Sequence, residues 1–265
     1  MKNITTCLEM LKLTMLIYDY GKNFTEYNNI ENLDISDLNK SVLSEIIDNN
    51  PNGNIVKFIS LNNGLQVCIT ISHINNRITT IFRGSESFKD WLYDLLIIQT
   101  KLKDDIYVHK GFKEQLEPAK DDLIYTINKL LQEYPKYKLF TTGHSLGGAL
   151  STLFGYYLSE VFSPNEVNII SFASPRVGNK AWSNLINNKY NLKHYRFINE
   201  KDIVVSIPYI NYYHTGIKCY LNKKKLVYID EKIDNDCCCL FYNPLDHSIE
   251  KYYNNLLNYL NNSLI

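Results

Sequence analysis

Residues 137–150 read YKLFTTGHSLGGAL, and they carry the strongest structural signal in the chain. The run Leu139–Thr142 is apolar and β-branched, which is typical of a strand buried in a sheet. From Leu146 to about residue 162, apolar residues recur at helical spacing. The pattern Gly-x-Ser-x-Gly lies between the two and puts Ser145 on the turn. A strand, this turn and a helix in that order predict a nucleophile elbow with Ser145 as the nucleophile.

The two glycines of this pattern have a steric purpose. A serine on so sharp a turn has a strained backbone, and side chains on its flanks would collide with the strand and the helix. Gly143 and Gly147 carry no such side chains. The helix that follows points backbone N–H groups and the positive end of its dipole at the space above Ser145. The Leu146 N–H is therefore a predicted donor to an oxyanion.

Length and composition narrow the class of protein. A chain of 265 residues can bury a sizeable core, and we expect one α/β domain over residues 1–265. The formal net charge is zero, so the chain has no electrostatic footprint for nucleic acid or an anionic membrane. Cys237, Cys238 and Cys239 are adjacent, whereas paired zinc ligands need about two to four intervening residues. We therefore expect no metal site and no cofactor.

The location is predicted from features of the chain that do not depend on the elbow. The first twelve residues mix Glu9 and Lys12 with apolar residues and do not resemble a signal peptide, and no stretch is apolar enough to span a bilayer. Six cysteines without a secretion signal predict reduced thiols in the cytosol. We expect a monomer that is cytoplasmic or peripheral to lipid surfaces, with export by another route left open. A disulfide from Cys219 to one of residues 237–239 also stays open.

The remaining elements are predicted from periodicity and turn residues. Helices are expected over residues 5–20, 36–47, 112–133 and 181–186 and from 247 onward, and strands over 55–61, 65–72, 77–82, 139–142, 167–172, 194–198, 216–221 and 226–229. Short Asn-rich turns join the first three strands, which favours antiparallel hairpins. Later strands alternate with helices. The pattern predicts a mixed, mostly parallel sheet with helices on both faces.

The catalytic partners of Ser145 can be sought along the chain. A serine hydroxyl is a weak nucleophile unless a histidine removes its proton and an acid holds that histidine. On this kind of fold the acid follows the serine and the histidine comes last. Asp202 follows a predicted strand and is the leading acid, with Glu200 as its rival. We favour His247, in the loop before the last helix, over His214, which precedes a hairpin strand. His144 is excluded as the base, because the residue before the nucleophile points elsewhere on a tight turn.

Several segments between about residues 65 and 255 match one family together. They read IFRGS (81–85), SFKDWLYDL (87–95), VHKGF (108–112), GHSLGGA (143–149), PRVGN (175–179), RFINEKDIV (196–204), YHTG (213–216) and LDH (245–247). In these segments the chain resembles the class 3 lipases, the family typified by filamentous-fungal triacylglycerol lipases, and the resemblance implies an α/β-hydrolase fold. It also implies that Asp202 is the triad acid, that His247 is the triad histidine and that His214 lies outside the triad. Ser85 would hold the oxyanion through its N–H and its hydroxyl.

The chain departs from the family pattern at two places that bear on lid behaviour and on the choice of substrate. The chain has Val205 where the family commonly has proline, and its lid segment is short. That segment, at about residues 86–98, places an apolar face on a short helix; the face consists of Phe88, Trp91, Leu92, Leu95 and Leu96. The pattern alone fits a core helix equally well, whereas the resemblance favours a lid that opens at a lipid surface.

The function expected from these observations is hydrolysis of lipid esters. The first expectation is a triacylglycerol or other acylglycerol lipase acting at an oil–water or membrane interface. A phospholipase A1 or a soluble carboxylesterase with the same triad is the close alternative. A catalytically silent lipid-binding protein on the same fold is the third possibility, and it would be favoured by a missing triad member.

Overall fold

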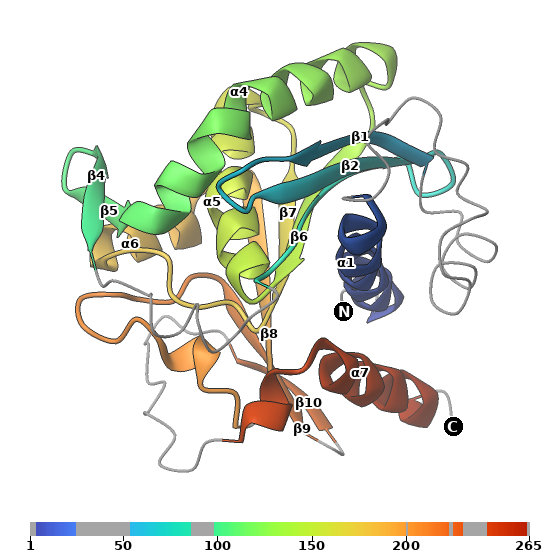
Figure 1. Cartoon of the computed structure of the whole chain (residues 1–265), viewed down its shortest axis with the longest axis vertical. Helices are drawn as coiled ribbons and strands as arrows, with labels where there is room; N and C mark the ends of the chain where they lie inside the picture. Colours follow the sequence, from blue (N-terminus) through green and yellow to red (C-terminus); the bar gives the residue numbers. More distant parts are fainter. Residues whose placement is uncertain are drawn as a thin grey trace.

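The computed structural model describes residues 4–24, 54–85, 98–199, 201–222, 225–229 and 243–263. Within these ranges, eight strands form one sheet in the order β1-β2-β3-β6-β7-β8-β9-β10 (Figure 1). Their bounds are β1 Asn54–Ser60, β2 Gln66–Ser72, β3 Arg77–Phe82, β6 Lys138–His144, β7 Val167–Phe172, β8 Leu192–Asn199, β9 Ile217–Asn222 and β10 Lys225–Ile229. Every strand expected from the sequence is present, with bounds that differ by a residue or two.

The strand directions make the sheet mixed but mostly parallel. β1, β2 and β3 are antiparallel neighbours, β3 through β9 run parallel across β6, β7 and β8, and β10 is antiparallel to β9. Phe82 of β3 pairs with Gly143 of β6, and Gly143 pairs with Ser171 of β7. The carboxyl ends of the parallel strands therefore meet at one edge, where α/β folds place their sites. This topology confirms the predicted sheet.

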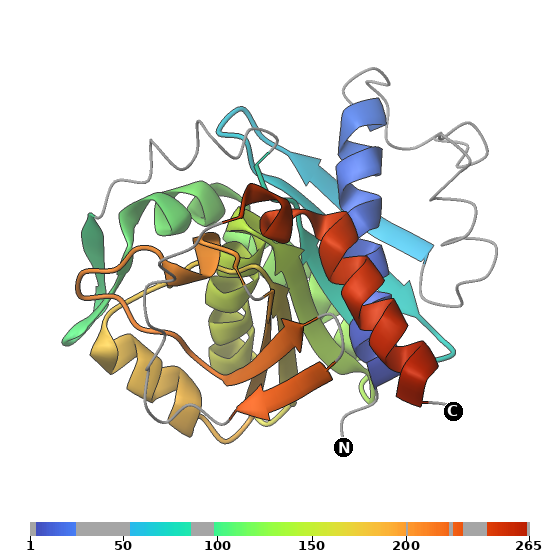
Figure 2. The ribbon, with the colours of Figure 1, turned by 90° about the horizontal axis from the view of Figure 1, so that it is seen from below.

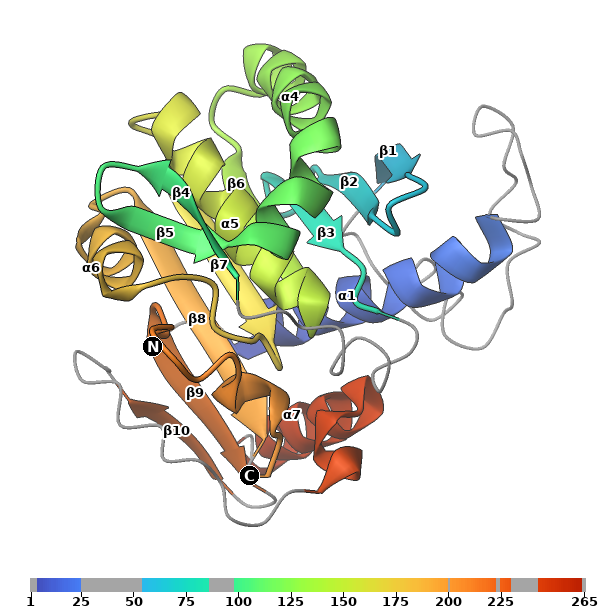
Figure 3. The ribbon, with the colours of Figure 1, turned by 60° about the vertical axis from the view of Figure 1, so that its left-hand side comes forward.

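Helices cover both faces of the sheet (Figure 3). α4 (Lys110–Glu133), α5 (Leu146–Val161) and α6 (Lys180–Asn188) pack on one face. α1 (Ile4–Phe24) and α7 (Ile249–Ser263) pack on the other, where they contact each other (Figure 2).

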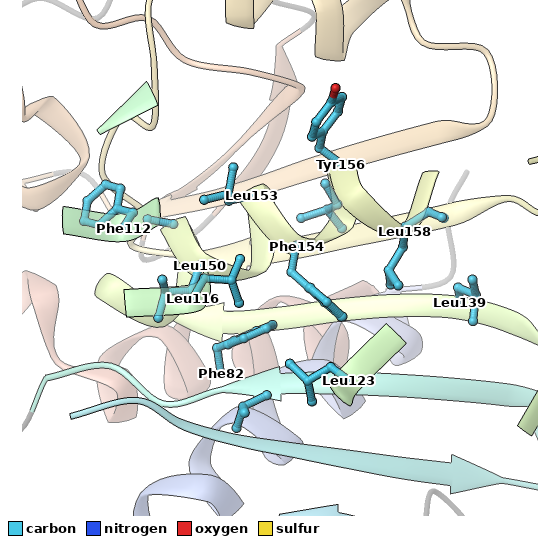
Figure 4. Close-up of a cluster of buried hydrophobic side chains, with 14 of the residues drawn as sticks. Phe82, Phe112, Leu116, Leu123, Leu139, Leu150, Leu153, Phe154, Tyr156 and Leu158 are labelled. Carbon is cyan, nitrogen blue, oxygen red and sulfur yellow. The ribbon is translucent and has the colours of Figure 1, made fainter. Parts of the chain in front are cut away.

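Strands supply side chains to both hydrophobic layers, because successive residues of a strand point to opposite faces. Val67 and Ile69 of β2 enter the layer under α4 and α5, whereas Cys68 between them enters the layer under α1. In the first of these layers, the ring of Phe82 lies edge-on to that of Phe154 in α5, with centroids 5.5 Å apart (Figure 4). The two layers fix the sheet from both sides and hold its carboxyl edge in place.

α5 differs from its sequence pattern in how much of it is buried. The apolar periodicity predicts a helix with one buried face, but every residue from Leu146 to Tyr156 is buried. The reason is that the sheet covers one side and α4 covers another. The helix approaches the sheet so closely that a Cβ on Gly155 would lie 2.6 Å from Ile169 Cγ1. Only its end emerges, since Val161 is 53% exposed.

Three further differences concern the connecting segments. A hairpin that the sequence did not predict, β4 (Gln99–Lys103) with β5 (Ile106–His109), precedes α4. The last helix begins at Ile249 after a short 3₁₀ turn, η4 (Pro244–His247), and not at residue 247 as expected. The expected helix over 36–47 and most of the expected lid, residues 86–97, lie outside the described residues. None of the described helices combines the length and the apolar character needed to cross a membrane.

Candidate active site

The turn between β6 and α5 has the geometry of a nucleophile elbow. Ser145 has φ 58° and ψ −126°, a strained conformation for a residue with a side chain. Its N–H donates to the Phe172 carbonyl over 3.0 Å, and its own carbonyl accepts from Gly148 N–H over 2.9 Å. A Cβ on Gly143 would lie 2.3 Å from Gly147 C, and one on Gly147 would lie 2.2 Å from the Phe82 carbonyl oxygen. The turn is therefore possible only with glycine at both flanking positions.

The structure brings Ser145, His247 and Asp202 together in one line of hydrogen bonds. Ser145 Oγ lies 3.0 Å from His247 Nε2. On the other side of the ring, His247 Nδ1 lies 3.0 Å and 3.1 Å from the two carboxylate oxygens of Asp202. All three side chains are buried. The arrangement lets Nε2 accept the serine proton while Asp202 fixes Nδ1 as the protonated nitrogen.

Asp202 follows β8 and is completely buried. An ionised carboxylate in this position needs several donors, because burial without partners is strongly unfavourable. Besides His247, the Val204 N–H donates to Oδ1 over 3.0 Å and the Tyr252 hydroxyl donates to Oδ2 over 2.7 Å. Burial, with the Asp202 charge beside it, raises the pKa of the Tyr252 phenol well above its usual value. Tyr252 therefore stays protonated and acts only as a donor to this carboxylate.

The loops that carry the acid and the base are joined to each other through Asp246. Its carboxylate accepts from the Lys201 N–H over 3.1 Å and from Asn243 Nδ2 over 3.0 Å. Lys251 of α7 forms an ion pair with the same carboxylate. From the acid side, Asn199 Nδ2 donates to the Asp246 carbonyl over 2.9 Å. The distance between Asp202 and His247 is thus set by contacts on both of their loops.

His214, the alternative base, forms a hydrogen bond to a backbone carbonyl outside the triad. Its Nε2 donates to the Val205 carbonyl over 2.5 Å, and the ring is buried. Burial lowers the pKa of this imidazole well below its usual value, and the charges of Arg196 and Arg176 lower it further. Glu200, the alternative acid, lies outside the described residues.

Ser85 and Leu146, the two predicted oxyanion donors, line one cavity of about 510 Å³, together with Arg83, Gln115 and others. The chain leaving β3 passes close to the elbow, since a Cβ on Gly84 would be 3.3 Å from Ser145 Cβ. The residues predicted for the lid face, Phe88, Trp91, Leu92 and Leu95, fall outside the described residues.

Within the described residues, no group of three or more His, Cys, Asp or Glu side chains is placed to hold a metal ion. Cys219 is buried in β9, and its possible partners at 237–239 lie outside the described ranges.

Two residues near the triad could not be predicted as part of it. His144 was set aside as a base, and its nitrogens do bond elsewhere: Nε2 to the His247 carbonyl at 2.8 Å and Nδ1 to the Tyr18 hydroxyl at 3.1 Å. The ring nevertheless lies against that of His247, with centroids 4.7 Å apart. Tyr18 comes from α1, more than a hundred residues before the elbow. No local pattern in the sequence marks either contact.

A mixed, mostly parallel sheet with a serine, a histidine and an aspartate at the carboxyl edge of its strands defines an α/β-hydrolase. The family model described as lipase (class 3) matches residues 79–212, half of the chain. The chain belongs to this family of class 3 lipases.

Individual relatives and a solved structure agree with this assignment. A lipase of Rhizomucor miehei is 33% identical over 133 residues, which are 48% of this chain and 36% of the relative. A secreted mono- and diacylglycerol lipase of Penicillium cyclopium is 32% identical over 145 residues, or 54% of this chain and 47% of the relative. The chain thus spans less than half the length of either. The solved triacylglyceride lipase of R. miehei superposes with a TM-score of 0.79 at 23% identity over 92% of each chain, which confirms the fold.

Proposed function

We propose that this chain is a serine hydrolase that cleaves carboxylic esters of lipids, with acylglycerols as its main substrates. The observation that carries the proposal is the 3.0 Å contact between Ser145 Oγ and His247 Nε2, backed by the two contacts of His247 with Asp202. Membership of the class 3 lipases supports the choice of an ester as the substrate.

The reaction would proceed through an acyl-enzyme. Ser145 Oγ attacks the ester carbonyl carbon while its proton moves to His247 Nε2, and Asp202 stabilises the imidazolium that forms. The tetrahedral intermediate then collapses, the bond to the alcohol breaks, and His247 gives the proton to the leaving oxygen. Water repeats the sequence on the acyl-enzyme, so that the acid leaves and Ser145 recovers its proton.

The negative charge on the carbonyl oxygen would be held by the Leu146 N–H and by the N–H and hydroxyl of Ser85. Leu146 is the first residue of α5, so its N–H points out of the helix at the positive end of the dipole. Ser85 supports the role by its position in the same cavity. One such donor contributes about 3 kcal/mol to stabilisation of the transition state.

Lipids are the proposed substrate class because of the family and the sequence of residues 86–98. An apolar helix there would act as a lid within one hydrolase domain and open where the chain, as a monomer, meets an oil–water or membrane interface. The two relatives named above are called lipase and mono- and diacylglycerol lipase. For location, we propose a lipid surface within a reducing compartment. The buried thiol of Cys68 is compatible with it.

The test is hydrolysis of p-nitrophenyl esters from short to long acyl chains, below and above their micelle concentration. The proteins compared are the wild type and Ser145→Ala. Triolein, monoolein and phosphatidylcholine are then assayed for released fatty acid.

The outcomes of this experiment distinguish a lipase from the alternative functions. Activity that is lost in Ser145→Ala, and that rises for long chains once micelles form, supports a lipase with a moving lid. Activity confined to short dissolved esters contradicts the lipid substrate and indicates a carboxylesterase, whereas preference for phosphatidylcholine indicates a phospholipase A1. If the wild type hydrolyses no ester at all, the proposed hydrolase function is contradicted and a lipid-binding protein is favoured.

A further inference from the structure

A chain of hydrogen bonds runs from α1 to the carbonyl of the proposed base. The Tyr18 hydroxyl oxygen lies against Gly84. The Tyr18 hydroxyl in turn lies 3.1 Å from His144 Nδ1, and His144 Nε2 lies 2.8 Å from the His247 carbonyl oxygen. Four segments are joined in this way: the strand end before Ser85, helix α1, the elbow and the loop of His247.

The direction of every bond in this chain is fixed by chemistry. The His247 carbonyl can only accept, so His144 Nε2 must carry the hydrogen. Burial, together with His247 beside the ring, lowers the pKa of His144 well below its usual value, so the imidazole is neutral. A neutral ring with hydrogen on Nε2 has only a lone pair on Nδ1, and Tyr18 must donate to it.

The contacts around Tyr18 are close enough to fix its position. A Cβ built on Gly84 would lie 2.2 Å from the Tyr18 oxygen and 2.6 Å from the His144 carbonyl, so only glycine lets the three segments meet. Burial raises the pKa of the Tyr18 phenol, which keeps its hydrogen available for donation. The rings of Tyr18 and His144 meet edge-on, with centroids 6.1 Å apart.

We propose that Tyr18 and His144 are positioning residues, which hold the oxyanion strand and the base in register with Ser145. This inference rests on the proposed ester hydrolysis. Neither side chain touches the reacting atoms: Tyr18 acts through Gly84, the neighbour of Ser85, and through His144, which acts through the backbone of His247. Helix α1 contributes no reacting group, yet it completes the site.

Loss of the Tyr18 hydroxyl would remove its contact with Gly84 and its hydrogen bond to His144. In Tyr18→Phe, His144 Nδ1 loses its partner in a buried place, and Gly84 loses the oxygen that lies against it. The strand end before Ser85 and the backbone of His247 are then free to shift relative to Ser145. A shift of about 1 Å in a catalytic group can lower the rate about 100-fold.

The test compares Tyr18→Phe with a matched change on the same helix face. Thr14 lies one turn earlier in α1, is fully buried, and has its hydroxyl 3.1 Å from that of Thr142 in β6. Thr14→Val therefore removes a buried polar contact between α1 and β6 without touching Tyr18. The urea midpoints of both variants are measured, along with kcat and KM for dissolved p-nitrophenyl butyrate. The rate at which a fluorophosphonate labels Ser145 is measured as well.

We expect Tyr18→Phe to lower kcat and the labelling rate about 10- to 100-fold with KM within about twofold, while Thr14→Val shifts the urea midpoint similarly and keeps kcat. His144→Gln, whose amide can still donate to the His247 carbonyl, should retain more activity than His144→Leu. The inference is overturned if Tyr18→Phe keeps its kcat, or if both α1 variants lose it equally. A wild type that neither hydrolyses the ester nor is labelled would instead overturn the proposed function, and this inference with it.

Discussion

Tyr252 donates its hydroxyl hydrogen to Asp202 Oδ2 over 2.7 Å, and the same hydroxyl oxygen accepts from the Asn199 N–H over 2.9 Å. One side chain of α7 thus holds the acid and the strand end from which the acid departs. Because Asp202 is fully buried, each of its donors offsets part of the cost of burying its carboxylate.

Replacement of Tyr252 by phenylalanine tests this contact. We expect a kcat about 10-fold lower, since a hydrogen bond to a charged group contributes about 1.5–3 kcal/mol and a 10-fold rate change corresponds to 1.4 kcal/mol. The same change should lower the free energy of unfolding by about 1–3 kcal/mol. Tyr259→Phe, two turns further along α7, is the control and should leave kcat unchanged. Equal rates for the two variants would show that the hydroxyl of Tyr252 does not support the acid.

The hydroxyl of Ser85 can be separated from its backbone N–H by substitution. Ser85→Ala keeps the N–H and removes the hydroxyl, and we expect kcat for p-nitrophenyl butyrate to fall about 100-fold, as for the loss of one oxyanion donor. Ser85→Thr keeps a hydroxyl at the same position and should retain most of the activity. If alanine and threonine gave the same rate, the hydroxyl would have no part in holding the oxyanion.

The close packing of the elbow predicts different outcomes for two glycines of one helix. A Cβ on Gly147 would meet the Phe82 carbonyl oxygen, a backbone atom in the sheet, whereas one on Gly155 would meet Cγ1 and Cδ1 of the Ile169 side chain. Gly147→Ala should therefore lower the free energy of unfolding by about 3 kcal/mol or more. Gly155→Ala should lower it by less than Gly147→Ala, because a side chain can shift where a backbone carbonyl cannot, and alanine favours helix over glycine by about 1 kcal/mol. Urea unfolding monitored by circular dichroism measures both, and a smaller loss for Gly147→Ala would contradict the packing argument.

The sheet and the elbow were predictable because their signals are local. Strands such as Arg77–Phe82 and Val167–Phe172 are short apolar runs between turn residues, and the Gly-x-Ser-x-Gly turn identifies itself. The sequence also named Ser145, Asp202 and His247, which the structure brings into contact.

The supporting residues that the sequence did not predict contact the site from distant parts of the chain. Tyr18 reaches His144 across 126 residues and Tyr252 reaches Asp202 across 50 residues, and neither pair has a spacing that a sequence pattern could reveal. In α7, Tyr252 is fully buried, whereas its neighbour Tyr253 is only partly buried. The Tyr252 hydroxyl bonds to Asp202 and to the Asn199 N–H in the interior, and hydropathy alone does not reveal these contacts.

The buried histidines predict how stability changes with pH. His214 is neutral in the folded protein, because burial and the nearby arginines lower its pKa, whereas in the unfolded chain it takes up a proton below about pH 6.5. The unfolded state then binds more protons than the folded state, so stability falls as the pH falls, by about 1.4 kcal/mol per pH unit for each such histidine. Burial lowers the pKa of His144 in the same direction, so it adds its own share.

His214→Gln isolates one of these two contributions. The glutamine amide can still donate to the Val205 carbonyl but cannot titrate. The free energy of unfolding, measured in urea at pH 5.0, 5.5, 6.0, 7.0 and 8.0, should therefore depend less steeply on pH in the variant below about pH 6.5, by about 1.4 kcal/mol per unit. Between pH 7.0 and 8.0 the curves of wild type and variant should run parallel, since His214 is then neutral in both states. An unchanged slope below pH 6.5 would mean that His214 is protonated in the folded protein, and its bond to the Val205 carbonyl would then not require the neutral ring.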